Sequence, residues 1–364
     1  MERTITVELG PRSYDVRVAP GLLHAVGQVA AQLDAGAAVV ISDSNVAPLY
    51  GKGVLDCLAE AGISATLIDF PAGEANKNLS TCGRLFDALF AITPAIDRDC
   101  LIVALGGGVT GDLAGLVAAA ALRGLRWIQC PTSLLADVDA SVGGKTGVDH
   151  PAGKNLIGAF HQPSSVLIDP DALKTLGPGE FRDGLSECVK HAIIRDAAKL
   201  EFLEDNAAEI LSRDGEVMTE LIAWNVQIKA GVVSADEKEA GERAHLNFGH
   251  TIAHAIEAQV GFGRISHGQA VALGMVAACH MAVLRGFIEQ DSAQRVEDLL
   301  RQFDLPVSWD GLNADGIWDI MQHDKKARGG EVHMVLPVVI GQVAIFDDVT
   351  QEVTSDAVEY LGRS

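Results

Sequence analysis

Short apolar runs alternate with segments of helical periodicity in the first half of the chain. In the first ten residues, Ile5, Val7 and Leu9 alternate with polar positions, which is typical of a strand. Further strands are predicted at residues 37–42, 65–69, 101–105, 127–130 and 166–168. Helical patterns lie between them, for example at residues 79–92 and 113–123. Alternating strands and helices predict a parallel sheet with helices on both faces.

The pattern changes near Gly177-Pro-Gly179. Beyond it, helical periodicity dominates, at residues 180–195, 216–236, 250–260, 269–285 and 293–303. Residues 332–345 indicate a small hairpin. We therefore predict an α/β protein with an N-terminal Rossmann-like parallel-sheet domain at residues 1–178. A C-terminal, mainly α-helical domain is predicted at residues 179–364.

Composition and charge exclude several classes of function. The 364 residues carry a formal net charge of -21, which repels nucleic-acid backbones and excludes them as partners. The longest apolar run, residues 270–284, is too short to span a bilayer and predicts a buried helix, so no membrane is expected. No N-terminal targeting signal is expected, and the six cysteines lack a Cys-x-x-Cys pair. These features predict reduced thiols and a cytoplasmic location.

A glycine-rich turn follows the strand at residues 101–105. Gly106 to Gly111 spell G-x-G-x-x-G between a strand and a helix, where Gly108 and Gly111 let the backbone approach a pyrophosphate. The acidic residue that usually follows about twenty positions later is missing, although Asp43 at an earlier strand end could contact a ribose. Asp112 could cap the helix or meet the cofactor. The alternative is a turn that only permits tight helix packing.

Two lysines follow glycines in the next segment. Lys145 lies in Gly143-Gly-Lys-Thr-Gly147, and Lys154 in Gly153-Lys-Asn-Leu-Ile-Gly158. The spacing is not that of a Walker A motif. We interpret the segment as glycine loops that present cations to phosphate or carboxylate. Solvated loop lysines are the alternative, but local positive charge in so acidic a chain favours binding.

Glutamate and histidine residues in the second half suggest a metal site. His250 and His254 are four residues apart and share one helix face, so this pair is the natural zinc hypothesis. Glu187 or His267 would supply the third ligand. Two imidazoles and a carboxylate, with one position open to substrate, suit a catalytic Lewis acid. Core or surface histidines are the alternative, and spacing does not decide which histidine is a ligand and which carries protons.

Several segments, in this order, resemble those of 3-dehydroquinate synthases. They are residues 42–50, 106–115, 141–148, 153–160, 246–251 and 324–326. The similarity spans nearly the whole chain. It implies NAD- and divalent-metal-dependent conversion of 3-deoxy-D-arabino-heptulosonate 7-phosphate to 3-dehydroquinate and phosphate, a lyase reaction of the shikimate pathway that leads to aromatic amino acids.

The resemblance also implies roles for single residues. The ligands of zinc or cobalt would be Glu187, His250 and His267. Catalytic roles are implied for His254, Lys190, Lys145, Asp139 and Asn247. Substrate contacts are implied for Arg123, Lys145, Asn155, Lys190, Lys229, Arg243, Asn247, Lys325 and Lys326. NAD contacts are implied for Asp43, Glu74, Lys77, Gly108, Gly111, Asp112, Thr132, Ser133, Asp139, Lys145, Lys154 and Thr175. Arg123 would reach into the neighbouring subunit, which implies a homodimer.

Three other functions are alternatives. Another sugar-phosphate cyclase would act on a substrate without the carboxylate, and Lys190, Arg243, Asn247 and His254 argue against it. A metal-dependent alcohol or glycerol dehydrogenase would accumulate NADH and would need fewer cations in its pocket. A non-catalytic NAD-binding regulator would tolerate loss of the metal ligands.

Overall fold

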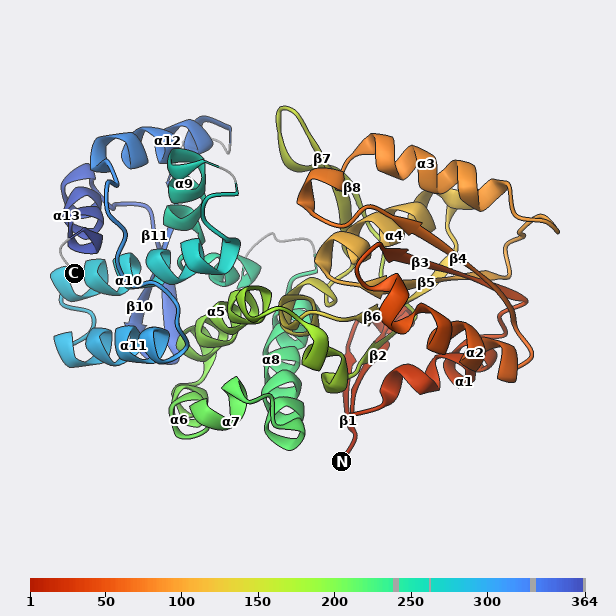
Figure 1. Ribbon diagram of the computed structural model, residues 1–364. Helices are drawn as coiled ribbons and strands as arrows, with labels where there is room; N and C mark the ends of the chain where they lie inside the picture. Colours follow the sequence, from red (N-terminus) through yellow and green to blue (C-terminus); the bar gives the residue numbers. More distant parts are fainter. Residues whose placement is uncertain (238–241, 262, 328–331, 363–364) are drawn as a thin grey trace. The chain divides into compact units, whose positions relative to one another are not determined.

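The computed structural model describes residues 1–237, 242–261, 263–327 and 332–362 (Figure 1). The side chains of Glu242 and of residues 323–327 are outside this description. Predicted phosphate contacts Lys325 and Lys326 therefore lie outside the described side chains. The chain forms two compact units, Met1–Gly177 with Gly215–Ser234, and Pro178–Asp214 with Ala235–Ser364. The predicted boundary at residue 178 places residues 215–234 in the second domain, whereas they belong to the first unit.

Unit 1 is built on a seven-stranded sheet in the order β1-β2-β9-β6-β5-β3-β4. Its strands are β1 (Arg3–Val7), β2 (Tyr14–Val18), β3 (Ala37–Asp43), β4 (Ser64–Phe70), β5 (Cys100–Gly106), β6 (Arg126–Pro131) and β9 (Ser165–Ile168). Only the β1–β2 pair in this sheet is antiparallel. The predicted Rossmann-like parallel sheet is confirmed.

Helices cover both faces of this sheet because its central strands are apolar on both sides. Val40 of β3 belongs to one core with helices α1 (Val26–Gln32) and α2 (Lys52–Glu60), while its neighbour Ile41 belongs to the other. Helices α3 (Leu79–Phe90) and α4 (Gly108–Ala120) complete that second core. Successive side chains of a strand point to opposite faces, so an unbroken apolar run needs both layers. Unit 1 also includes most of helix α8 (Gly215–Ala235).

The predicted glycine loops form a two-stranded hairpin instead. β7 (Lys145–His150) pairs antiparallel with β8 (Gly153–Phe160), so both lysines lie on strands. Gly147 is opposite Gly158, and a Cβ on Gly158 would lie 2.2 Å from the carbonyl oxygen of Thr146. The glycines therefore permit close backbone approach. Their low strand propensity hid the hairpin from the sequence pattern.

Unit 2 is mainly helical, as predicted. Its helices are α5 (Pro178–Arg195), α6 (Ala197–Asp205), α7 (Ala207–Leu211), α9 (His250–Val260), α10 (His267–Leu284), α11 (Gln290–Gln302), α12 (Ala314–Ala327) and α13 (Gln351–Leu361). The predicted hairpin is present as β10 (Met334–Val339) and β11 (Gln342–Phe346). Helix α10 alone, among the described residues, is long and apolar enough to cross a membrane, and 72% of it is buried. That burial is typical of a core helix.

All six cysteines are free thiols. Burial raises the pKa of Cys130 and of Cys279 to about 12, which keeps both thiols protonated. Since the thiolate is the reactive form, these cysteines are inert core residues, as the scattered spacing predicted.

Asp137 is a buried acid in the short helical segment Ala136–Ala140 between β6 and β7. Its side chain is fully inaccessible, and neither oxygen has a hydrogen-bond partner among the described residues. Burial, and secondarily the carboxylate of Asp169, raises the pKa of Asp137 well above its usual range. The folded chain therefore keeps a proton here that the unfolded chain releases above about pH 4.

Replacing Asp137 by Asn should make the stability less dependent on pH. In the wild type, the free energy of unfolding falls as pH rises above the unfolded-state pKa, because the folded state binds the extra proton. One proton corresponds to a slope of up to about 1.4 kcal/mol per pH unit. Urea unfolding from pH 5 to 8 measures the slope, with the exposed Asp99→Asn as control. Equal slopes for wild type and Asp137→Asn would contradict the assignment.

Candidate functional site

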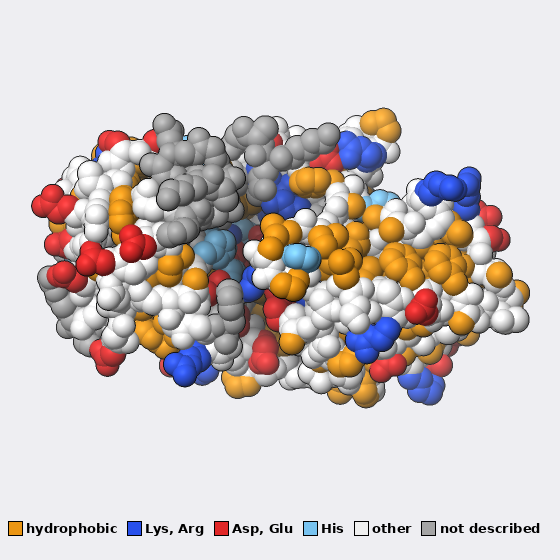
Figure 2. All heavy atoms as spheres, turned by 90° about the horizontal axis from the view of Figure 1, so that it is seen from above, with side chains coloured by type: hydrophobic (Ala, Val, Ile, Leu, Met, Phe, Trp, Pro, Cys, Tyr) orange, Lys and Arg blue, Asp and Glu red, His pale blue; other side chains and the backbone are white. Residues whose placement is uncertain are grey.

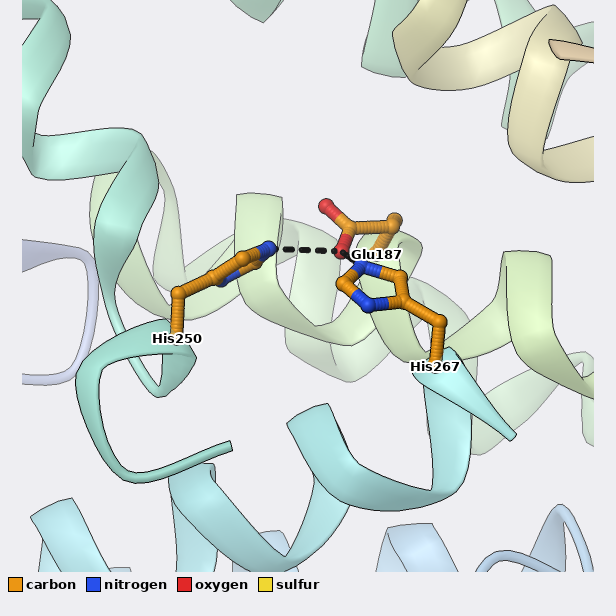
Figure 3. Close-up of side chains that lie close together, drawn as sticks. All are labelled: Glu187, His250 and His267. Carbon is orange, nitrogen blue, oxygen red and sulfur yellow. Dashed lines mark ion pairs between the residues drawn. The ribbon is translucent and has the colours of Figure 1, made fainter. Parts of the chain in front are cut away.

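A carboxylate and two imidazoles converge in unit 2. Glu187 lies on α5, His250 is the first residue of α9, and His267 is the first residue of α10. Figure 3 shows both imidazoles directed at Glu187. The Nε2 atoms of His250 and His267 are 3.4 and 3.8 Å from Oε1 of Glu187. One donor atom from each residue lies within 4.8 Å of the other two.

This donor set fits a tetrahedral metal ion. With bonds of about 2.0–2.1 Å, neighbouring ligand atoms in such a site are about 3.3–3.5 Å apart. The Glu187 side chain is only 1% exposed. Lys190, one turn later on α5, forms an ion pair with its Oε2, but neither oxygen accepts a well-oriented hydrogen bond from the described residues. A buried carboxylate with two imidazoles and spare acceptor capacity suits zinc or cobalt.

Hydrogen bonds at Nδ1 orient both imidazoles. Nδ1 of His250 is 3.1 Å from the carbonyl oxygen of Phe248, and Nδ1 of His267 is 3.3 Å from Oε1 of the buried Glu257. A donor proton on Nδ1 leaves Nε2 as the free lone pair. Such partners fix the tautomer and the ring orientation of metal-binding histidines.

The protonation of the two imidazoles follows from their surroundings. Burial, together with the ammonium group of Lys190, lowers the pKa of His250 well below its usual value, which favours the neutral ligand form. Burial also opposes a charge on His267, but the carboxylates of Glu257 and Glu187 outweigh it and raise the pKa of that residue. A bound cation would compete with the proton on Nε2.

Glycines next to both histidines let the three helices approach. Gly249 has φ +77°, and a Cβ on Gly274 of α10 would lie 2.0 Å from its carbonyl oxygen. Gly268 follows His267, and a Cβ there would lie 2.3 Å from the Cα atom of Asp183 on α5. Close backbone contact between α9, α10 and α5 therefore brings the donors together.

Three other predicted residues of unit 2 lie near His250 in the sequence: Arg243, Asn247 and His254. His254 is exposed, with its ring centroid 5.6 Å from that of His250 and 6.4 Å from that of His267. Its imidazole is not part of the three-donor group. Asn247 is partly buried three residues before His250, and Arg243 is buried with its guanidinium donating to the carbonyl oxygen of Glu237 at 2.7 Å.

The glycine turn of unit 1 begins helix α4 at the carboxyl end of β5. Asp43, at the end of β3, accepts a hydrogen bond from the hydroxyl group of Thr110 at 3.1 Å. The backbone N–H of Thr132, after β6, donates to the carbonyl oxygen of Gly106 at 3.1 Å. A Cβ on Gly111 would lie 2.3 Å from the amide nitrogen of Gln129, so this glycine serves helix–sheet packing. Nucleotides bind at this edge of parallel sheets.

Lys77 connects Asp112 of helix α4 to Asn155 of the β7–β8 hairpin. Its ammonium group is 2.5 Å from Oδ2 of Asp112 and donates to Oδ1 of Asn155 at 2.6 Å. Burial opposes the charge on Lys77, but Asp112 outweighs it and raises the pKa of the lysine. In the same unit, the ammonium group of Lys229 on α8 is 2.5 Å from Oδ1 of Asp139. Four predicted contact residues are thus paired in unit 1, and Asn155 joins one pair.

The remaining predicted residues of unit 1 differ in exposure. Glu74, Arg123, Lys145 and Lys154 are exposed, Thr132 is buried, and Gly108 and Ser133 are partly buried at the turn. A Cβ on Gly107 would lie 3.2 Å from Oγ of Ser133, which places this hydroxyl beside the glycine turn. The hydroxyl group of Thr175 is 2.6 Å from that of Tyr50.

Two orienting groups were missed from the sequence. Glu257 lies seven residues after His250 on α9, and Asp183 accepts a hydrogen bond from the hydroxyl group of Ser266 at 2.5 Å. Ser266 also forms a capping box with Gln269 at the start of α10. The Ser-x-x-Gln spacing is a readable signal for this helix start, which carries His267. No sequence pattern around Glu257 or Asp183 indicates that its carboxylate lies near a histidine of another helix.

The fold and these donors define a class, an α/β nucleotide-binding unit joined to a helical unit with a metal-type donor set. Comparison with known proteins narrows it. A family model described as 3-dehydroquinate synthase N-terminal matches residues 67–183, and its C-terminal counterpart matches residues 184–327. A 3-dehydroquinate synthase of Symbiobacterium thermophilum is 43% identical over 361 residues, covering 98% of this chain and 100% of that protein. The chain belongs to the 3-dehydroquinate synthase family.

Solved structures agree with this family. A 2-epi-5-epi-valiolone synthase from Streptomyces hygroscopicus, with NAD⁺ and Zn²⁺ bound, has a TM-score of 0.88 at 32% identity and covers 96% of each chain. A 2-deoxy-scyllo-inosose synthase with carbaglucose-6-phosphate, NAD⁺ and Co²⁺ has a TM-score of 0.88 at 26% identity, over 98% of this chain and 100% of that one. Alcohol and glycerol dehydrogenases between 14% and 18% identical share the fold alone.

Substitution of the two candidate histidines separates ligand from proton carrier. His267→Ala should lower the affinity for Zn²⁺ or Co²⁺ by more than about 100-fold, because losing a ligand exceeds the 10–100-fold effect of losing an orienting partner. His254→Ala, a matched change on the neighbouring exposed imidazole, should lower it by less than about tenfold. Competition with a chelator measures both affinities. The reverse order would restore the pair that the four-residue spacing first indicated.

Proposed function

We propose that the protein is a 3-dehydroquinate synthase, a carbon-oxygen lyase that releases phosphate from 3-deoxy-D-arabino-heptulosonate 7-phosphate and closes the carbocycle. The observation that carries this proposal is the 43–46% identity, over nearly the full length, to proteins of that name. The buried donor set supports the requirement for a metal. The glycine turn at the start of α4 supports the requirement for NAD.

Glu187, His250 and His267 would hold the metal ion. Asp43, Glu74, Lys77, Gly108, Gly111, Asp112, Thr132, Ser133, Asp139, Lys145, Lys154 and Thr175 would contact NAD. When bound, NAD accepts and returns a hydride, and the metal ion polarises the alcohol oxygen of the substrate. Because the hydride returns in each turnover, the net reaction is an elimination and a ring closure with no net oxidation.

The chain's cations would bind the charged substrate and stabilise the leaving phosphate. Arg123, Lys145, Arg243 and the Lys325–Lys326 pair would carry the charge of the phosphate. Lys190, Lys229, Asn155 and Asn247 would complete the substrate contacts. A net charge of -21 makes such a local cationic pocket necessary for an anionic substrate.

Proton transfer would fall to His254 and Lys190, with Lys145, Asp139 and Asn247 as further catalytic residues. The exposed imidazole of His254 lies beside the donor set without belonging to it. This position beside the donor set supports a role for His254 as a proton carrier. Free thiols in all six cysteines support the cytoplasm as the place where the enzyme works.

A homodimer would complete the site through Arg123. This residue is exposed, with φ +68°, in the turn after α4. Exposed apolar side chains on the same unit include Leu156 (61%) and Phe160 (51%) on β8 and Phe90 (52%) on α3. Figure 2 shows hydrophobic side chains gathered over unit 1. Apolar surface of this kind supports contact with a second copy.

Turnover with a catalytic amount of NAD tests the activity. Metal-loaded protein should release one phosphate for each heptulosonate phosphate consumed, while NADH stays below the amount of NAD added. Sedoheptulose 7-phosphate and glucose 6-phosphate are the control substrates and should release little phosphate. Stoichiometric NADH would identify a dehydrogenase, and preference for a control substrate would identify another cyclase.

Mixing two inactive variants tests the role of Arg123. Arg123→Ala and His254→Ala should each lose at least about 100-fold in kcat. If Arg123 acts in the partner's site, a mixed dimer contains one intact site. Statistical exchange should then restore about a quarter of the wild-type rate. Light scattering confirms the dimer, and the absence of any recovery after exchange would place Arg123 in its own subunit's site.

A further inference from the structure

Asp149 lies near the end of β7, at the register shift between Val148 and His150, and makes two short contacts. Its backbone N–H donates to the carbonyl oxygen of Lys77 at 2.8 Å, and its Oδ1 accepts the backbone N–H of Asn155 at 2.8 Å. A parallel bridge also joins Asn78 to Asp149. The residue therefore ties the hairpin turn to the segment that carries Lys77.

Together with the side chain of Lys77, these hydrogen bonds form a closed circuit. Asn155 completes it, because its Oδ1 accepts a hydrogen bond from the ammonium group of Lys77 at 2.6 Å. The circuit runs from the Lys77 backbone to Asp149, from Asp149 to Asn155, and from Asn155 to the Lys77 ammonium group. Asp112, 2.5 Å from that ammonium group, holds the lysine from the other side.

Asn155 needs this support because its backbone is unusual. Its φ is +56°, a left-handed conformation that Asn tolerates but that its own side chain does not enforce. Gly147 and Gly158 approach closely in the body of the hairpin, whereas the register shifts nearer the turn, between Val148 and His150, where Asp149 lies. Among the described side chains, Asp149 is the acceptor for the N–H of Asn155.

We propose that Asp149 is a positioning residue that fixes the backbone of Asn155 and thereby aims the Asn155 amide. The proposal rests on the proposed function, in which Asn155 contacts the substrate and Lys77 contacts NAD. Asp149 touches neither ligand in this scheme. Its effect should fall on substrate affinity, because Lys77 keeps its ion pair with Asp112 when Asp149 changes.

The test compares Asp149→Ala, which removes the acceptor, with Asp149→Asn, which keeps an acceptor oxygen but removes the charge. Asp149→Ala should raise KM for the heptulosonate phosphate about five- to tenfold, the size expected for one hydrogen bond to a polar group, with kcat and the Kd of NAD within about twofold. Asp149→Asn should restore KM to within about twofold of wild type. Asp97→Ala is the matched control, because Asp97 accepts the backbone N–H of Asp99 at 2.9 Å in another loop of unit 1.

Hydrogen exchange of the segment at residues 150–158 provides a readout that does not need activity. Asp149→Ala should speed exchange there, whereas Asp149→Asn and Asp97→Ala should not. Unchanged exchange in Asp149→Ala would overturn the proposal, as would an Asp149→Asn variant as impaired as Asp149→Ala, which would point to charge. An equal rise in KM and in the Kd of NAD would indicate general loosening and also overturn it. If the wild type fails to turn over the substrate, the proposed function fails, and the exchange comparison still decides the positioning role.

Discussion

The burial of Glu187 is the constraint on which the helical unit depends. A carboxylate that is 1% exposed is costly unless cations or strong donors surround it. Lys190 supplies a cation from the same helix, and His250 and His267 bring imidazoles from two other helices. The packing of α5, α9 and α10, with glycines at their closest approaches, therefore serves one charged group. A metal ion at this position would neutralise the carboxylate that the fold already encloses.

Unit 1 contains the opposite case, a buried cation. Lys77 is held by Asp112 and by the amide oxygen of Asn155, and Asp149 ties the turn of the hairpin to the backbone of the same lysine. Charges that are paired inside the fold have fixed positions, and fixed positions are what cofactor and substrate recognition requires. Ion pairs thus hold Lys77 and Lys229 in unit 1 and Lys190 in unit 2.

Much of this architecture follows from local patterns. Apolar runs at residues 37–42 and 101–105 became β3 and β5 because a buried parallel strand needs apolar residues on both faces. Helix α10 was equally clear from its long apolar run. The β7–β8 hairpin was not, because glycines and lysines have low strand propensity, and close backbone packing between Gly147 and Gly158 replaces the side-chain pattern. Segment 215–234 joined unit 1 through contacts with residues far away in the sequence.

For the donor set, the sequence by itself determined the types of residue and one spacing. Helical periodicity placed His250 and His254 on one face, and it placed Lys190 one turn after Glu187. Tertiary structure decided which imidazoles meet the carboxylate, because His267 begins another helix and its distance from Glu187 is set by how α10 packs on α5. It also turned His254 outward while Phe248 and Glu257 oriented the other two rings. Periodicity fixes neighbours within one helix, whereas the distance between helices depends on packing that no single segment encodes.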